Sequence, residues 1–352
     1  MPFNSGKIKK NIGVFFSIGF ISFCILISIF SYFIIPDDSQ YSNQMHLEIN
    51  SMPPGFKTYI IEIPGKHNEN QLSKKFFGNR FPNKEIVVKE YDLKKNGIKI
   101  LDYKNEEKLI DYNLFPNSMS ISEIEEKFIS IRTFFFGTDR FGRDYFGRVI
   151  LGTRVSLSIG FLAVFISLII GLIFGMIGGY YGGTIDKIIM SIINIFWSIP
   201  TLLLVIAISV ALGKGFWQVY IAVGLTMWVE VARIVRGQVI SEKNKDYITA
   251  TKVLGYSTFR IFYHHLIPNI IGPILIICAA NFASAILIES GLSFLGIGTQ
   301  PPIPSWGSMI KDNFQFIMLG KAYLAIIPGI SIMLLVTSFM FLGNNLKELN
   351  SE

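Results

Sequence analysis

Long apolar runs separated by polar segments dominate this chain. A helix needs roughly 20 apolar residues to cross about 30 Å of hydrocarbon. Runs of that length occur at six places, at about residues 13–35, 155–178, 188–212, 216–236, 269–297 and 323–346. The pattern therefore predicts an all-α polytopic membrane protein with six transmembrane helices.

The first apolar run follows a lysine-rich tail, as the apolar region of a secretory signal would. Its apolar residues continue to Ile35 without a small-x-small cleavage site. We therefore interpret residues 1–36 as an N-terminal tail followed by an uncleaved first transmembrane helix.

Positive charges near the N-terminus predict the orientation of the chain. Because lysine and arginine favour the cytoplasmic side, Lys7, Lys9 and Lys10 place the N-terminus there. Six crossings return the C-terminus to the cytoplasm and leave the polar loop from Arg233 to Arg260 on the same side. The segment 37–136 is then extracytoplasmic, and its length exempts it from the charge rule.

The segment 37–136 alternates apolar and polar residues in several short stretches. The alternation is clearest at residues 58–63, 85–89 and 97–101, which are separated by Pro, Gly and Asn. This pattern predicts a β-containing extracytoplasmic insert. Contact with a binding protein or with cargo and a purely structural role both remain open for it.

A polar stretch between two apolar runs has the pattern of two short helices. It reads Asp246-Tyr-Ile-Thr-Ala-Thr-Lys-Val-Leu-Gly255, and His265-Leu-Ile-Pro-Asn269 follows. Its apolar residues recur at helical spacing, Gly255 stands where a helix end favours a left-handed residue, and Ser257 can cap a second helix. Because Pro268 suits the first turn of the next helix, the stretch leads directly into a membrane span.

This stretch resembles the coupling loop of ATP-binding-cassette (ABC) importer permeases, because the glycine, the His-x-x-Pro-Asn element and the distance between them match. Further blocks are similar to those of the dipeptide/oligopeptide permease family and occur in the same order. They are Gly137-Thr-Asp-Arg-Phe-Gly-Arg-Asp144, Gly179-Tyr-Tyr-Gly-Gly-Thr-Ile-Asp186, Ala232-Arg-Ile-Val-Arg-Gly237, Leu292-Ser-Phe-Leu-Gly296 and Pro301-Pro-Ile-Pro-Ser-Trp-Gly307. The resemblance covers about residues 137–346 and is to the second, C-type permease subunit.

The resemblance implies the type I ABC-importer permease fold, with a permease core of five transmembrane helices over residues 137–352 and a cytoplasmic coupling loop at about 241–268. It implies that residues of this loop receive movement from an ATPase. These residues are Asp246, Tyr247, Ala250, Leu254, Gly255, His265, Pro268 and Asn269.

The resemblance also implies partners and a location. The partners are a homologous second permease subunit, two cytoplasmic ATP-binding subunits and an extracytoplasmic substrate-binding protein, in the lipid of a bacterial inner membrane. Peptides are the expected cargo, although relatives transport nickel chelates and other solutes. Thr249 departs from the family pattern, because many members carry a glutamate at this position of the coupling motif.

Ionisable residues inside membrane spans are the default candidates for function. Glu230 lies one helical turn before Arg233, so an i,i+3 ion pair accounts for both residues, with a gate as the alternative. Glu289 follows Pro268 by roughly 31 Å of helix, at about 1.5 Å per residue. We therefore expect it near the outer surface of the membrane, in a structural hydrogen bond rather than a proton relay.

The composition agrees with a membrane protein and argues against other classes. Hydrophobic residues make up 51% of the chain and charged residues 16%, whereas an average soluble domain has about 25% charged residues. The net charge of +7 is spread over loops without a basic helix, so no nucleic-acid partner is expected.

No enzyme motif is recognisable in the sequence. The chain lacks a G-x-x-x-x-G-K-[ST] loop, so partner chains are expected to hydrolyse ATP. His264 and His265 point to different faces of any helix, and Cys24 and Cys278 lie inside apolar runs, so no metal site and no cofactor are predicted.

A secondary transporter or channel subunit that works without an ATPase is the alternative function. It predicts dependence on an ion gradient and leaves the coupling loop without a role. Copurification with ATPase subunits distinguishes the two functions.

Overall fold

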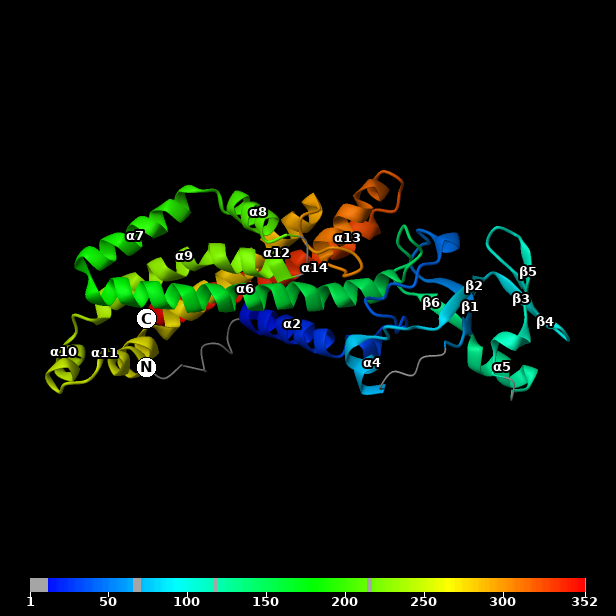
Figure 1. Cartoon of the computed structure of the whole chain (residues 1–352), viewed down its shortest axis with the longest axis horizontal. Helices are drawn as coiled ribbons and strands as arrows, with labels where there is room; N and C mark the ends of the chain where they lie inside the picture. Colours follow the sequence, from blue (N-terminus) through cyan, green and yellow to red (C-terminus); the bar gives the residue numbers. More distant parts are fainter. Residues whose placement is uncertain (1–11, 66–70, 117–118, 214–216, 352) are drawn as a thin grey trace. The chain divides into compact units, whose positions relative to one another are not determined.

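The computed structural model describes residues 12–65, 71–116, 119–213 and 217–351 (Figure 1). The chain divides into two compact units. We call Met1–Ile25, Val155–Gln300 and Ile330–Glu352 the helical unit, and Leu26–Arg154 and Pro301–Gly329 the sheet unit.

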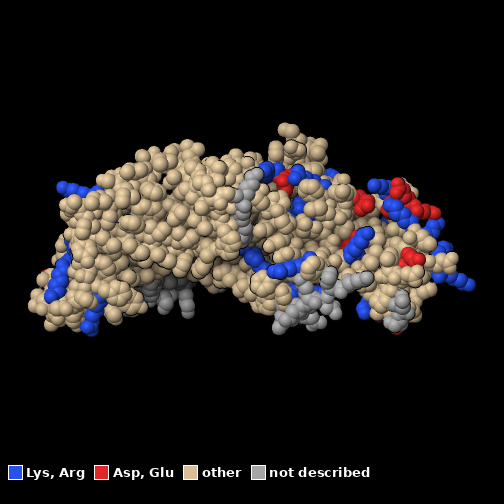
Figure 2. Space-filling view, in the orientation of Figure 1, with Lys and Arg blue, Asp and Glu red and all other residues tan. Residues whose placement is uncertain are grey.

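Within the described residues, four helices are long and apolar enough to cross a membrane. They are α6 (Tyr145–Tyr181), α9 (Trp217–Glu242), the continuous helical segment Thr258–Leu295, which contains α12 (Ile267–Leu295), and the segment Tyr323–Asn345 of α14 (Tyr323–Ser351). Figure 2 shows few charged side chains over most of the visible face of α6. Each of the four coincides with a predicted apolar run.

A fifth span exists if two bent helices count as one. Helices α7 (Gly183–Ser198) and α8 (Thr201–Ala211) meet at an angle of 93°. The residue before a proline is disfavoured in the α region, and Ile199 accordingly has extended backbone angles next to Pro200. The predicted run at 188–212 is therefore interrupted by a sharp bend, as in a broken span or a re-entrant loop, and we call the pair α7 and α8 the broken span.

The first predicted run has a shorter counterpart. Its described part comprises α2 (Ile12–Ile29) and α3 (Ser31–Ile34), and α2 is apolar but shorter than the spans listed above. Lys7, Lys9 and Lys10, on which the predicted orientation rests, lie outside the described residues. The described part of the chain thus has four or five candidate spans, whereas the sequence predicts six.

Helices α6 and α9 approach each other closely along a row of glycines. A Cβ atom added to any of the three glycines would lie under 3.0 Å from the Cβ of a valine on α9. The facing pairs are Gly171 with Val231, Gly175 with Val235, and Gly179 with Val239. Small residues at spacing four allow such backbone approach, so the glycine row of α6 receives the valine row of α9.

The sheet unit confirms the predicted β-containing segment. Six antiparallel strands form two sheets, with the strand orders β2-β1-β6 and β3-β4-β5. The strands are β1 (Phe56–Ile63), β2 (Lys84–Val88), β3 (Glu90–Lys94), β4 (Gly97–Leu101), β5 (Glu107–Ile110) and β6 (Ile129–Phe134). The stretches predicted at 58–63, 85–89 and 97–101 are β1, β2 and β4.

Short helices within the same segment were not predicted. They are η1 (Leu47–Ile49), α4 (Gln71–Phe77), η2 (Tyr112–Leu114) and α5 (Ile121–Phe128). Helix α5 starts at a capping box formed by Ser120 and Glu123, and it contributes Ile124 and Phe128 to the core shared with the strands. The S-x-x-E pattern is readable in the sequence and would have located this helix.

Three of the four charged residues of the 137–144 block, Asp139, Arg143 and Asp144, are buried, whereas Arg140 is exposed and pairs with Asp312. Nη2 of Arg143 lies 2.6 Å from a carboxylate oxygen of Asp139, and the same guanidinium donates to Asn43 at 3.1 Å. Burial raises the pKa of Asp144 to about 7, and the nearby charge of Asp37 acts in the same direction. These charges hold the sheet unit together instead of forming an exposed amphipathic surface.

The remaining part of the sheet unit packs on the start of α6. Helix α13 (Trp306–Asn313) begins at a capping box of Ser305 and Ser308, and η4 (Phe314–Ile317) follows. The indole of Trp306 is buried and donates to the carbonyl of Val149 at 3.0 Å. The Pro301–Gly307 block thus acts as a structural contact.

The glycine row generates a stability prediction. In Gly175→Ala, the added methyl would meet the carbonyl of Ala232 and the side chain of Val235 at 2.7 Å, so α6 and α9 must separate. We expect a lower melting temperature in detergent, measured by tryptophan fluorescence. Gly291→Ala is the control, because its methyl meets open space and alanine favours a helix over glycine by about 1 kcal/mol. Equal melting of the two variants would contradict the close approach.

Candidate functional site

The loop between α9 and α12 has the predicted helix, turn and helix. Helix α10 spans Asp246–Val253, Gly255 makes the turn, and α11 spans Thr258–Ile261. The second helix leads into the span without a break, because the π-helical turn η3 (Phe262–Leu266) joins α11 to α12. Pro268 lies in the first turn of α12, directly after this π-helical turn.

The turn at Gly255 is a Schellman motif. Gly255 has a φ of +75°, the N–H of Tyr256 donates to the carbonyl of Thr251 at 3.1 Å, and the N–H of Gly255 donates to Lys252 at 3.0 Å. The side chain of Ser257 then accepts from the N–H of Arg260 at 3.4 Å and caps α11. Both predictions about this turn are confirmed.

The inner face of the loop is part of the core of the helical unit. Ile248, Ile261 and Leu266 are fully or almost fully buried, and they belong to one apolar cluster with residues of α9 and α12. The α9 and α12 members are Val231, Val235, Val239, Ile270 and Ile274. The loop is therefore packed against both neighbouring spans rather than hanging free.

A hydrogen-bonded carboxylate fixes the start of the loop. Glu242, the last residue of α9, accepts from the Tyr247 hydroxyl at 2.7 Å and lies 2.6 Å from Nζ of Lys245. Burial and the hydrogen bond to Glu242 raise the pKa of Tyr247 to about 12, so this hydroxyl keeps its proton at neutral pH. Tyr247 is half-buried, and its hydroxyl bonds to the end of α9.

The outer face of the loop is apolar and exposed. Leu254 has 69% of its surface accessible, and Ala250 is also exposed. Three further exposed apolar side chains were not among the predicted coupling residues. They are Val253 at 83%, Phe259 at 79% and Tyr263 at 61%. We call Ala250, Val253, Leu254, Phe259 and Tyr263 the outer apolar face. The spacing of four between Phe259 and Tyr263, whose rings stack at 6.4 Å, is the sequence signal that would have found them.

The other predicted loop residues lie around this face. Asp246 is exposed in the first turn of α10, where a carboxylate favours the helix dipole. His265 is half-buried with its ring stacked on Tyr256 at 5.9 Å, and its carbonyl accepts from the Asn269 amide at 2.6 Å. Figure 2 shows lysine and arginine side chains at the end of the helical unit where α10 and α11 lie.

The sequence blocks at residues 179–186 and 232–237 meet where α7 packs on α9. Both carboxylate oxygens of Asp186 accept from Arg236, at 2.5 and 2.6 Å. Directly after the end of α9, Nζ of Lys243 donates to the carbonyl of Gly179 at 2.8 Å. The start of the broken span and the end of α6 are thus both fastened to the helix that carries the loop.

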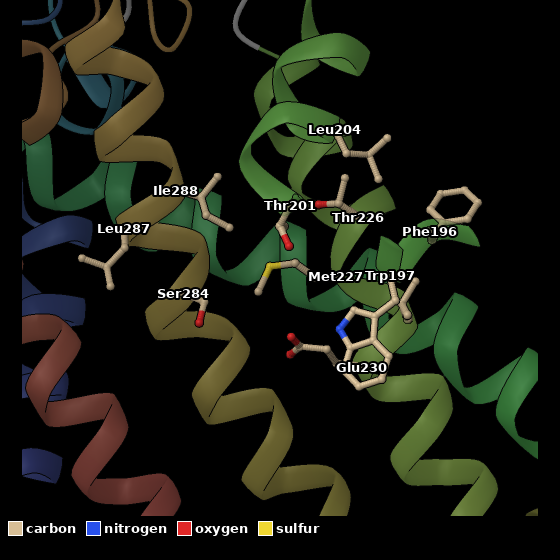
Figure 3. A pocket seen from close by; sticks show the side chains of 11 residues that line it. Phe196, Trp197, Thr201, Leu204, Thr226, Met227, Glu230, Ser284, Leu287 and Ile288 are labelled. Atoms are coloured by element: carbon tan, nitrogen blue, oxygen red, sulfur yellow. The ribbon is translucent and has the colours of Figure 1, made fainter. Parts of the chain in front are cut away.

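The predicted ion pair between Glu230 and Arg233 is wrong. No ion pair joins these two side chains among the described residues, because the Arg233 guanidinium lies over the ring of Trp197, 3.4 Å from its centroid. Glu230 instead is exposed and lines a cavity of about 330 Å³ (Figure 3).

Glu289 is fully buried near the end of α12. One of its carboxylate oxygens accepts from the hydroxyls of Ser293 at 2.6 Å and Thr299 at 3.0 Å. The Ser293 hydroxyl in turn accepts from the N–H of Thr299 at 3.0 Å. These bonds tie the turn after Gly296 back onto the helix.

Comparison with known proteins finds a protein family that matches part of this sequence. The family described as "Binding-protein-dependent transport system inner membrane component" matches residues 167–348. A dipeptide transport system permease protein of Alkalihalophilus pseudofirmus is 42% identical over 214 residues, which cover 61% of this chain and 70% of the relative. An oligopeptide transport system permease protein of Salmonella typhimurium is also 42% identical, with the same coverage.

Solved structures give a more distant likeness. A crystal structure of an amino acid ABC transporter with histidines matches at 20% identity and a TM-score of 0.45, covering 58% of this chain and 94% of that chain.

The Schellman turn generates a prediction about the loop itself. Gly255→Ala forces a side chain into a left-handed conformation at a cost of about 1 kcal/mol, although nothing surrounds the new Cβ. Gly255→Asn is the matched control, because asparagine tolerates this conformation. We expect faster tryptic cleavage at Lys252 and Arg260 in the alanine variant only. Cleavage at the same rate in both variants would argue against the turn as described.

Proposed function

The chain belongs to the family of binding-protein-dependent transport system inner membrane components, and we propose that it forms half of the translocation path of an ABC importer for peptides or similar small solutes. The relatives named above, which serve dipeptide and oligopeptide transport, support peptides as the cargo. One observation carries the proposed mechanism: the loop between α9 and α12 exposes apolar side chains on one side and is packed into the spans on the other.

The outer apolar face is proposed as the surface that docks on a cytoplasmic ATP-binding subunit. Burying a large apolar side chain contributes roughly 1.5–3 kcal/mol, so Val253, Leu254 and Phe259 together supply a strong contact. The eight loop residues derived from the family resemblance lie on the loop that carries this face or in the first turn of α12. Of these, Tyr247 and His265 support it from within, whereas Ala250 and Leu254 belong to it.

The inner face of the loop is proposed to transmit the movement. Because Ile248, Ile261 and Leu266 share one core with α9 and α12, a displacement of the loop would carry both spans with it. Alternating access would follow if the ATP-binding subunits close on ATP and open after its hydrolysis. The homologous second permease subunit would supply the other half of the path, and an extracytoplasmic substrate-binding protein would deliver the cargo.

The topology is proposed to be the type I arrangement with six spans and both termini in the cytoplasm. Helix α2 would be the first span, and the broken pair α7 and α8 the third. Residues 37–136 would then form an extracytoplasmic insert before the permease core at 137–352. Glu289 would lie near the outer surface of the membrane as a structural residue.

The docking surface is tested by adding one charge at adjacent positions of α10. Ala250→Glu places a carboxylate in the proposed contact, and because an unpaired buried charge costs several kcal/mol, we expect at least about tenfold weaker binding of the ATP-binding subunits. Thr249→Glu adds the same charge at the neighbouring exposed position, where many family members have glutamate, and should retain binding. Detergent pull-downs and coupled ATP hydrolysis in proteoliposomes measure the effect.

Membrane abundance of each variant is the control for folding. If Ala250→Glu retains the ATP-binding subunits and transports at the parental rate, the outer apolar face is not the docking surface. A parental chain that transports without any ATP-binding subunit would favour the secondary transporter or channel.

The topology is tested by labelling two exposed positions on intact cells. With Cys24 and Cys278 replaced by alanine, Lys95→Cys lies in the turn between β3 and β4, and Val253→Cys lies on the outer apolar face. We expect an impermeant maleimide to label the first directly and the second only after permeabilisation. Equal labelling of both positions on intact cells would refute the proposed orientation.

A further inference from the structure

A cavity opens where the broken span faces α9 and α12. Its volume is about 330 Å³, and side chains from α7, α8, α9 and α12 line it (Figure 3). The lining is mostly apolar, with Met227 and Ile288 among its walls, and Thr201 and Ser284 add hydroxyl groups. All of these residues belong to the helical unit.

Among the described residues that line the cavity, Glu230 is the one with an ionisable side chain. It lies near the middle of α9, and Figure 3 shows its carboxylate pointing away from the α9 backbone, towards the side of the cavity where Ser284 lies. Among the described residues, its carboxylate has neither an ion pair nor a hydrogen bond, because Arg233 is stacked on Trp197. Because α9 is a candidate membrane span, an ionised carboxylate on it is costly unless it has a cationic or hydrogen-bonding partner.

The size of the cavity limits what that partner can be. Ligand cavities commonly have about 300–1,000 Å³, and this one lies at the lower end. A cavity of this size accommodates one end of a solute rather than the whole of a long solute. The apolar walls favour a side chain next to the charged group, and the hydroxyls of Thr201 and Ser284 can hydrogen-bond to a neighbouring amide.

We propose that this cavity binds the protonated α-amino group of a transported peptide, with Glu230 as its carboxylate partner. The inference rests on the proposed function, since it takes peptides as the cargo. A primary ammonium group donates three hydrogen bonds, and a carboxylate and nearby hydroxyls are the acceptors that satisfy them. The site lies at the break between α7 and α8, so movement of either half against α9 would open or close it.

The test measures peptide binding to the complete transporter in detergent, without the substrate-binding protein. The probes are tri-alanine and N-acetyl-tri-alanine, which differ in the charge of the N-terminus. Because hydrogen bonds between charged groups are the strong ones, we expect the parental complex to bind tri-alanine at least about tenfold more tightly than the acetylated peptide. Glu230→Gln should remove this preference, and Glu230→Asp, which keeps the charge, should retain most of it.

The outcomes separate this inference from the proposed function. Uptake of tri-alanine by proteoliposomes that contain the parental complex and its binding protein reports on the proposed function alone. If uptake is normal but the parental complex binds both peptides equally, or fails to bind either, the amine site is refuted. Equal preference in the parental and Glu230→Gln complexes also refutes it. Loss of the second permease subunit from Glu230→Gln would show that Glu230 pairs with that subunit instead.

Discussion

The close approach of α6 to α9 is the constraint on which the rest of the helical unit depends. It exists because glycines of α6 leave room for valines of α9, and any added methyl at Gly175 would meet the facing backbone at 2.7 Å. Once α9 is fixed, Arg236 holds the start of α7, and Glu242 holds the start of the loop. Both the cavity and the outer apolar face are therefore positioned by one helix.

Much of this fold could be predicted from the sequence, because local rules act there directly. Gly255 was assigned its left-handed turn, and Pro200 lies beside the break of a span, since both residues restrict the backbone wherever they stand. Whether a given side chain is buried or exposed was harder to predict from the sequence. Tyr247 has helical spacing with Ala250 and Leu254, yet it is half-buried and its hydroxyl bonds to Glu242 at the end of α9.

The intramembrane charges show where sequence reasoning stops. Spacing alone suggests that Glu230 and Arg233 neutralise each other, but a ring from a different helix takes the guanidinium. The ring belongs to Trp197 at the end of α7, next to a 93° bend between α7 and α8 that a hydrophobic pattern does not reveal. Glu289 instead accepts hydrogen bonds from the hydroxyls of residues that follow closely in the chain. These bonds agree with the structural hydrogen bond expected for it. Contacts of a charged side chain with residues close in the sequence can be predicted from the sequence. Contacts with a residue on another helix, next to a bend, cannot.

The central claim is that the loop moves as one body with the spans that flank it. Paired spin labels on Val253 and Ile271, both exposed, report the distance between α10 and α12 in the assembled transporter. Because a shared apolar core joins the two helices, the account predicts the same distance distribution in the nucleotide-free and ATP-bound states. A distribution that shifts when ATP binds would show that the loop moves independently of α12, and it would contradict the account.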